Sequence, residues 1–332
     1  MRGQRPGPGP ADPRRLGGRR HRGRGSVVPV GVTTVTTAPA RLLVPLAWAN
    51  LVANIGIVIT GGAVRLTGSG LGCPTWPRCT DESYVAHGEL GLHGAIEFGN
   101  RLLTFVLVVI AIGCWLAALL PVLRDRVGPD RADRRPLLLS TIIALGIPAQ
   151  AVIGGITVHT DLNPWVVALH LLVSMAIIGV CVLLVDHLVG RPRAWADASS
   201  RRAGVATFLA GWVVLYLGTV VTGSGPHSGD EDSRRTGLDP GAMSHVHAWA
   251  VYVLVALTIA TLVLARRHGN LPLRNAALAL LAVEAVQGVI GYTQYFLDLP
   301  IALVLLHMLG AALTAAGLAW VAVSTRAHRP TR

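Results

Sequence analysis

Single histidines within long apolar segments are the residues of this chain best suited to bind a metal-containing cofactor. His170 and His307 each lie inside an apolar run, and His247 lies near the start of another. An imidazole inside a membrane is costly and usually has a partner. Histidine pairs on facing helices can hold haem iron from both sides. We therefore predict that His247 and His307 ligate a haem. A hydrogen bond to a backbone carbonyl is the alternative for each ring, and zinc is less favoured because further ligands do not converge.

His245 competes with His247 for this role. The two residues are two positions apart, so on a helix their side chains point about 200° apart and cannot both face one iron. We predict His247 as the ligand because it lies deeper in the apolar segment.

A polar group of residues opens another apolar segment, HGAIEFGNRLLT at 93–104. His93, Glu97 and Asn100 share one helical face by their i, i+4, i+7 spacing. Glu97 can also pair with Arg101 at i+4. Two interpretations of Glu97 stay open. It is either a surface carboxylate bridged to arginine near the lipid headgroups, or an acid/base group beside a buried cofactor.

Two cysteines lie six positions apart in the loop GSGLGCPTWPRC at 68–79. Its glycines and prolines favour a tight turn that brings the sulfurs of Cys73 and Cys79 together. A structural disulfide is one interpretation. The other is an exposed, redox-active disulfide that a partner oxidoreductase can reach.

Two arginines and several tryptophans lie at predicted membrane boundaries. Arg65 and Arg101 suit bidentate contact with haem propionates, with headgroup anchoring as the alternative. Four tryptophans are predicted to lie in the aromatic belts of the membrane interfaces: Trp48, Trp76, Trp165 and Trp249.

Composition identifies the elements that must position these residues. The chain has 332 residues, of which 52% are hydrophobic and only 14% charged, and its mean hydropathy is +0.54. A soluble domain carries about a quarter charged residues. Apolar runs long enough to cross a bilayer predict an all-α polytopic membrane protein. Eight transmembrane helices are expected, at about 42–64, 95–120, 137–158, 165–189, 203–222, 245–265, 273–293 and 300–323.

The arginines set the orientation. Twenty-four of the 29 lie in the N-terminal tail, in alternate loops or at the C-terminus. The positive-inside rule therefore predicts a multi-pass protein of the plasma membrane with both termini in the cytoplasm. The cysteine loop then faces outward, where a disulfide can persist. The net charge of +12 is explained by these loops, so no nucleic-acid partner is expected.

The chain also contains a tandem repeat. QAVIGG at 150–155 returns as QGVIGY at 287–292, and His170 returns as His307, both with an offset of 137. An even number of spans per repeat gives the two halves the same orientation. We predict two pseudo-symmetric four-helix bundles, 41–190 and 191–325, after a disordered basic tail at 1–40 and before a cytoplasmic tail at 326–332.

The two halves are unequal in ligands. The second half offers His247 and His307, which would saturate an iron and suit electron transfer. The first half offers His170, with Asn100 where a matching ligand is expected. Asparagine is a poor haem ligand, so we expect a haem there with one protein ligand and an open side, which suits chemistry on the haem itself.

GGAVRLTGSGLGCPTWPRC at 61–79, IEFGNR at 96–101 and the single histidines of helices 4, 6 and 8 resemble the haem A synthase family, over about residues 40–325. The resemblance implies an oxidoreductase that converts haem O to haem A by successive hydroxylations of the C8 methyl group, for maturation of cytochrome c oxidase. It implies haem b between His247 and His307, the substrate haem at His170, a functional Glu97 and a cysteine pair linked to thiol–disulfide exchange.

The family pattern Glu-x-x-His-Arg here reads Glu97-Phe-Gly-Asn100-Arg101. His93 lies seven residues before Asn100, which is about 10 Å along the helix axis, so it cannot reach the same iron and we expect His170 alone to ligate the substrate haem.

Expected partners are the lipid bilayer, a haem O synthase, a thiol–disulfide oxidoreductase and a second copy of the chain. A dihaem b-type electron-transfer membrane cytochrome is the alternative function. A transporter or assembly chaperone without redox chemistry is a third, which leaves the histidines unexplained.

Overall fold

The chain folds into eight long helices, which confirms the all-α prediction. The computed structural model describes residues 3, 38–124, 133–190, 196–227, 229–230 and 233–325, and these contain no strand. The helices are α1 (Ala38–Leu66), α2 (Gly91–Arg124), α3 (Arg135–His159), α4 (Pro164–Val189), α5 (Ala198–Ser224), α6 (Pro240–Arg267), α7 (Leu271–Phe296) and α8 (Ile301–Ser324). The two predicted tails fall largely or wholly outside the described residues.

Each of these helices is long and apolar enough to cross a membrane, so the chain is a multi-pass membrane protein. Most extend beyond the predicted spans, and polar side chains cap the first turns of α4, α5, α6 and α7. Asp239 caps α6 by accepting a hydrogen bond from the Ala242 N–H at 2.6 Å, and Pro240 occupies the first helical turn. As a result α6 begins five residues before the predicted position. His247 therefore lies in the second turn of α6, and the expected start of this helix at residue 245, which would place His247 in the first turn, is wrong.

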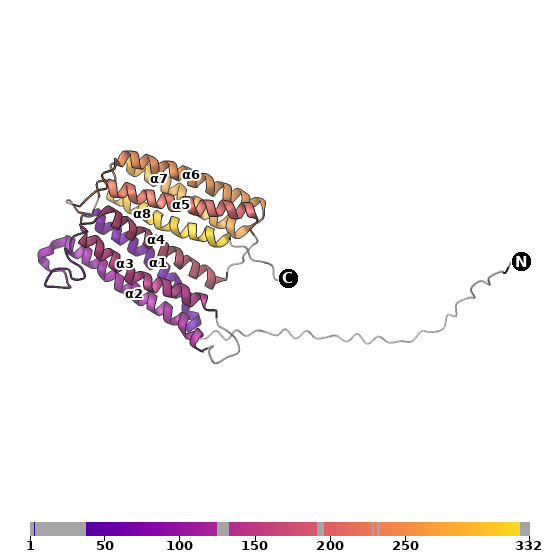
Figure 1. The fold of residues 1–332 in the computed structure, drawn as a ribbon, viewed down its shortest axis with the longest axis horizontal. Coiled ribbons are helices and arrows are strands. Elements are labelled where there is room, and N and C mark those ends of the chain that lie inside the picture. The colour runs from indigo at the N-terminus through magenta and orange to yellow at the C-terminus, as the bar shows by residue number, and fades with distance from the viewer. Residues whose placement is uncertain are drawn as a thin grey trace. The chain divides into compact units, whose positions relative to one another are not determined.

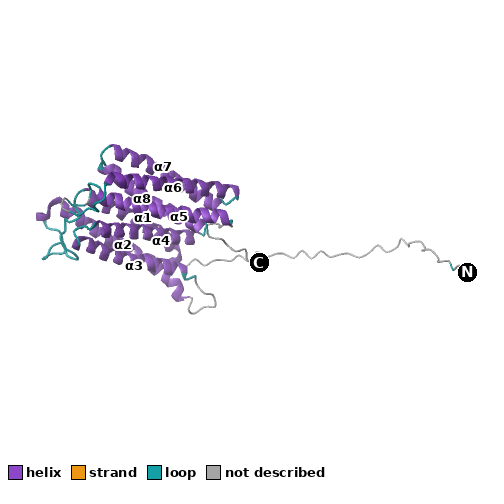
Figure 2. Ribbon diagram, turned by 45° about the horizontal axis from the view of Figure 1, so that its top comes forward, coloured by secondary structure: helices purple, strands orange, loops and turns teal. Residues whose placement is uncertain are grey.

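The helices pack in two rings of four within one compact unit (Figures 1 and 2). In the first ring α1 contacts α2, α2 contacts α3, α3 contacts α4, and α4 returns to α1. The second ring closes in the same order from α5 to α8. The rings meet where α8 packs on α1 and α4, and where α5 packs on α4. Consequently α2 and α4 lie diagonally across one ring, and α6 and α8 across the other.

Glycines allow the closest helix contacts of the second ring. A Cβ at Gly211 of α5 would lie 2.3 Å from the Leu318 side chain of α8, and a Cβ at Gly204 would lie 2.3 Å from Thr325. Leu318 is fully buried, so it has no space into which to retreat. The face of α5 that carries these glycines is therefore committed to packing on α8.

Gly211→Ala is expected to destabilise the protein by about 1–3 kcal/mol, since the added methyl overpacks the α5–α8 contact. The matched control is Gly56→Ala, because nothing lies within 4 Å of a Cβ at that glycine of α1. Unfolding of the purified protein in mixed micelles, followed by circular dichroism, measures both. Equal stability of the two variants would contradict this packing.

Candidate functional site

The three predicted haem ligands occupy equivalent places in their helices. His170 and His307 are each the seventh residue of their helix, and His247 is the eighth of its own. Helices α4, α6 and α8 run in the same direction, because one span separates α4 from α6 and one span separates α6 from α8. All three imidazoles therefore lie in the second turn at the same side of the molecule.

Each histidine ring lies against a glycine of the helix that precedes it. A Cβ at that glycine would meet the ring Cε1 atom at 3.4 Å, which is ordinary van der Waals contact. A side chain larger than alanine would displace the ring. The three pairs are Gly154–His170, Gly218–His247 and Gly291–His307.

The two nitrogens of each ring have different surroundings. Nδ1 of all three rings is buried. For His170 and His307 it has no hydrogen-bond partner among the described residues, whereas the His247 ring also interacts with the Val214 backbone. Nε2 is not buried in this way, and none of the hydrogen bonds among the described residues involves it. The ring edge that carries Nε2 is therefore available to coordinate a metal, while the other edge faces the protein.

The second ring of helices has a histidine on each of two diagonal helices. His247 lies on α6 and His307 on α8, and these helices do not contact each other. The two residues nevertheless interact electrostatically. Two imidazoles opposite each other across a helical bundle are the ligand set that a six-coordinate haem requires.

The first ring of helices has one histidine on the corresponding diagonal. His170 lies on α4, where its carbonyl accepts a hydrogen bond from Gln150 Nε2 at 2.9 Å. On α2, Asn100 Oδ1 accepts a hydrogen bond from Thr60 Oγ1 at 2.8 Å. Because its Oδ1 accepts this bond, Asn100 presents its Nδ2 group as a hydrogen-bond donor. His93 lies apart from this pair, with an exposed side chain whose Nδ1 is 2.9 Å from Ser69 Oγ.

Glu97 connects α2 to the cysteine loop. Its side chain is buried, with the residue only 6% exposed, so the interpretation as a surface carboxylate is wrong. Oε2 accepts a hydrogen bond from the Cys73 N–H at 2.5 Å, and Oε1 accepts one from Arg101 Nη2 at 2.5 Å. Of the carboxylates that the structure describes, only Glu97 and Glu284 are buried. Glu284 belongs to α7, where Thr258 donates to it at 2.8 Å.

Cys73 and Cys79 form a disulfide, as predicted, with their Cα atoms 4.5 Å apart. Both cysteines are completely buried, so the expectation of an exposed disulfide is wrong. The burial comes from contacts that are distant in sequence. Gly72 lies so close to α2 that a Cβ there would be 2.3 Å from the His93 carbonyl oxygen. Cys114 and Cys181 are free and buried within their helices.

Arg101 and Trp76 hold the rest of this loop. The Arg101 guanidinium donates hydrogen bonds to the carbonyls of Cys73, Thr75 and Arg78. Trp76 packs on α3, where a Cβ at Gly155 would lie 2.3 Å from its indole ring. Trp76 is therefore part of the loop–helix contact, and its place in an interfacial belt stays a prediction.

Arg101→Ala is expected to make the disulfide reducible at least about tenfold faster, because its carbonyl contacts keep the loop closed over the sulfurs. Arg78→Ala is the matched control, since Arg78 is an exposed arginine of the same loop. Mass-spectrometric counting of alkylated cysteines during treatment with a mild reductant gives both rates. Equal rates in the two variants would show that Arg101 does not protect the disulfide.

Arg65 joins α1 to the end of α5 and to the loop that follows α5. Its Nε donates to the His227 carbonyl at 2.7 Å, and its Nη2 donates to the Thr222 carbonyl at 2.8 Å. Beside it, the Gly70 N–H donates to the Gly229 carbonyl at 2.8 Å. Arg65, like Arg101, is thus bound to main-chain carbonyls, and propionate contact by either arginine stays a prediction.

We did not predict from the sequence which residues contact the three histidines and Asn100. Gly154 and Gly291 both occupy the fifth position of the repeated motifs QAVIGG and QGVIGY, so the repeat already carried that signal. Gly218 and Thr60 lie in no repeated motif. The donor set also fits haem by number, since haem takes one or two protein ligands and zinc three or four.

Residues 45–90 and 92–227 match the COX15-CtaA family model, which describes a cytochrome oxidase assembly protein. A protein named heme A synthase from Shewanella oneidensis is 24% identical over 305 aligned residues, covering 80% of this chain and 91% of that protein. Another from Paracoccus denitrificans is 27% identical, covering 77% and 80% respectively. A third, from Bacillus pumilus, is 33% identical over 39% of this chain. The family match includes the cysteine loop, all of α4 and all of α2 except Gly91, and it covers more than half of the residues. The chain belongs to the COX15-CtaA family of cytochrome oxidase assembly proteins.

Proposed function

We propose that the chain is a haem A synthase, an oxidoreductase that oxidises the C8 methyl group of haem O to a formyl group by successive hydroxylations. The family membership and the names of the relatives support this assignment. The observation that carries it is the inequality of the two diagonals. One ring of helices offers two histidines, whereas the other offers His170 and an asparagine.

The second ring is the proposed site of a haem b cofactor, held by His247 and His307. Gly218 and Gly291 leave room for the imidazoles against α5 and α7, so that each ring keeps its orientation. The haem, when bound, supplies one-electron transfer. His247 and His307 would both hold its iron, a ligand set that would suit electron transfer.

The first ring is the proposed site of the substrate haem O, with His170 as its protein ligand. Asn100 faces it from the diagonal helix and presents an amide donor, because Thr60 occupies its carbonyl oxygen. Glu97 is one helical turn before Asn100 on α2. We assign to its carboxylate the handling of protons at the edge of this site. The loop that carries the buried Cys73–Cys79 disulfide is proposed to cover the outer side of this site and limit the entry of water.

The surroundings of the enzyme follow from the arginine distribution and from the chemistry of the substrate. We propose a plasma-membrane location with both termini in the cytoplasm. The two bundles are proposed to comprise residues 41–190 and 191–325. A haem O synthase must supply the substrate, and a thiol–disulfide oxidoreductase is the proposed partner of the cysteine loop.

Asn100→His restores the Glu-x-x-His-Arg pattern of the family, and it is expected to give the substrate haem a second imidazole ligand and convert it to a low-spin six-coordinate form. The matched control is Thr60→Val, which removes the hydrogen bond to Asn100 without adding a ligand. Optical spectra and haem extraction measure the two effects. An Asn100→His variant whose haem spectrum matches that of the wild type would place Asn100 away from the substrate haem.

The proposed function is tested by extracting haem from the purified full chain after expression with a haem O supply. Mass analysis is expected to find haem A together with haem b. Recovery of haem b alone, from a protein with purely six-coordinate spectra, would instead establish an electron-transfer cytochrome.

A further inference from the structure

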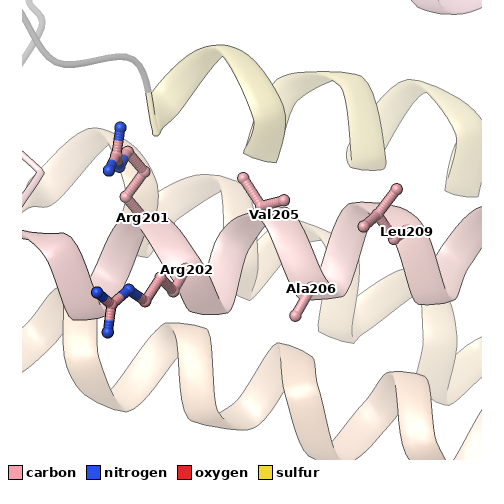
Figure 3. Close-up of a pocket in the computed structure, with 5 residues that line it drawn as sticks. All are labelled: Arg201, Arg202, Val205, Ala206 and Leu209. Carbon is pink, nitrogen blue, oxygen red and sulfur yellow. The ribbon is translucent and has the colours of Figure 1, made fainter.

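A shallow, open pocket lies on the exposed face of α5, near the N-terminal end of the helix. Its volume is about 360 Å³, and it is lined by residues of α5 alone: Arg201, Arg202, Val205, Ala206 and Leu209. Figure 3 shows their side chains along the first turns of the helix. This pocket belongs to the other end of the molecule from the histidines, which follow the starts of α4, α6 and α8.

The lining residues form two stripes along the helix. Arg201, Val205 and Leu209 are spaced by four and form one row, and Arg202 and Ala206 form a neighbouring row about 100° around the same face of α5 (Figure 3). In both stripes the arginine comes first and apolar residues follow it into the span. From Arg201 to Leu209 the helix rises about 12 Å. The pocket is therefore cationic at the end of the span and apolar below.

The two guanidinium groups are available for a ligand. Both side chains are exposed, and neither has an ion-pair or hydrogen-bond partner in the part of the chain that the structure describes. Asp197 lies one turn before Arg201, but its carboxylate accepts hydrogen bonds from the N–H groups of Ser199 and Ser200 as the cap of α5. Arginine pairs of this kind bind phosphate groups through parallel N–H donors.

The apolar part of the pocket is open as well. Val205 is 46% exposed and Leu209 is 59% exposed, although α5 is a membrane-spanning helix. Gly204 and Gly211 hold the opposite side of α5 against α8, so this face cannot turn inward. In a bilayer it is covered by acyl chains. A phosphate alone would leave Val205 and Leu209 without a partner, whereas a phospholipid satisfies both parts.

We propose that this pocket binds one anionic phospholipid. Arg201 and Arg202 hold its phosphate, and Val205, Ala206 and Leu209 contact the first part of an acyl chain. Basic pockets at the cytoplasmic ends of membrane helices recognise acidic headgroups in this way. The site is independent of the haem chemistry proposed above.

Native mass spectrometry of the full chain in detergent, with equal amounts of dioleoyl phosphatidylglycerol and dioleoyl phosphatidylcholine, tests the proposal. The wild type is expected to retain phosphatidylglycerol selectively. R201Q/R202Q is expected to bind it about 30-fold more weakly. The matched control is R266Q/R267Q, which removes the same charge at the C-terminal end of α6 and should change the affinity less than about twofold. Equal loss in both double variants would overturn a defined site in favour of general surface charge.

Two further experiments test the acyl-chain contact and distinguish a lipid site from a phosphate site. Leu209→Asn retains both arginines and is expected to weaken phosphatidylglycerol binding severalfold, so it serves if R201Q/R202Q does not fold. An unchanged affinity in Leu209→Asn would remove the acyl contact and overturn the lipid assignment. Addition of inorganic phosphate should leave the lipid bound. Displacement by millimolar phosphate would make this an anion site instead.

Discussion

Replacement of Glu97 by alanine is expected to abolish haem A formation while haem b stays bound. Loss of a positioned acid/base group typically slows a reaction by about 100- to 10,000-fold. The second ring of helices is untouched by this change. Haem extracted from the variant, expressed with a haem O supply, is therefore expected to contain haem b with haem O or a hydroxylated intermediate.

The structural role of Glu97 requires its own control. Its carboxylate also holds the Cys73 N–H and Arg101, so alanine releases the loop as well as the acid. Glu97→Gln keeps an acceptor for the Cys73 N–H but cannot handle a proton in the same way. Cysteine alkylation before and after reduction reports whether the disulfide survives. A glutamine variant with an intact disulfide and wild-type haem A output would contradict the proton-handling role.

Replacement of His247 by alanine is expected to lower haem b occupancy at least about tenfold, because even indirect support of a metal ligand is worth that much. The low-spin spectrum of the second haem should disappear with it. Haem O bound through His170 should remain, since that residue belongs to the other ring of helices. Redox difference spectra with quantitative haem extraction measure both quantities.

His245→Ala is the matched control for this experiment. His245 lies two residues earlier on α6, its side chain is exposed, and its ring is 6.3 Å from that of Tyr295. Its loss should leave haem b in place. If His245→Ala instead removed haem b and His247→Ala retained it, the ligand assignment on α6 would be wrong.

The helices could be predicted from sequence because length and hydropathy suffice to identify a membrane span. Their ends could not, because caps such as Asp239 are polar residues outside the apolar run. That is why α6 begins earlier than expected and His247 lies a turn deeper. The ring-like packing of the helices depends on which faces meet, and close contacts such as Gly211 on Leu318 decide this locally.

The sequence allowed us to predict which residues form the site, but not which residues surround them. The Cys73–Cys79 pairing followed from spacing and turn residues. Its complete burial did not, because Glu97 and Arg101 of a different element create it. Trp76 illustrates the same limit. A tryptophan near a membrane boundary suggested a lipid contact, whereas a glycine 79 positions later provides the surface on which it packs.

The central claim is that the two rings of helices hold haem in different ways. Electron paramagnetic resonance of the purified wild type, loaded with haem O, tests it most directly. The account predicts one low-spin haem with two imidazole ligands and one haem with a single histidine and an open side. Two low-spin signals that each require two imidazoles would contradict it, and would show that both halves serve electron transfer.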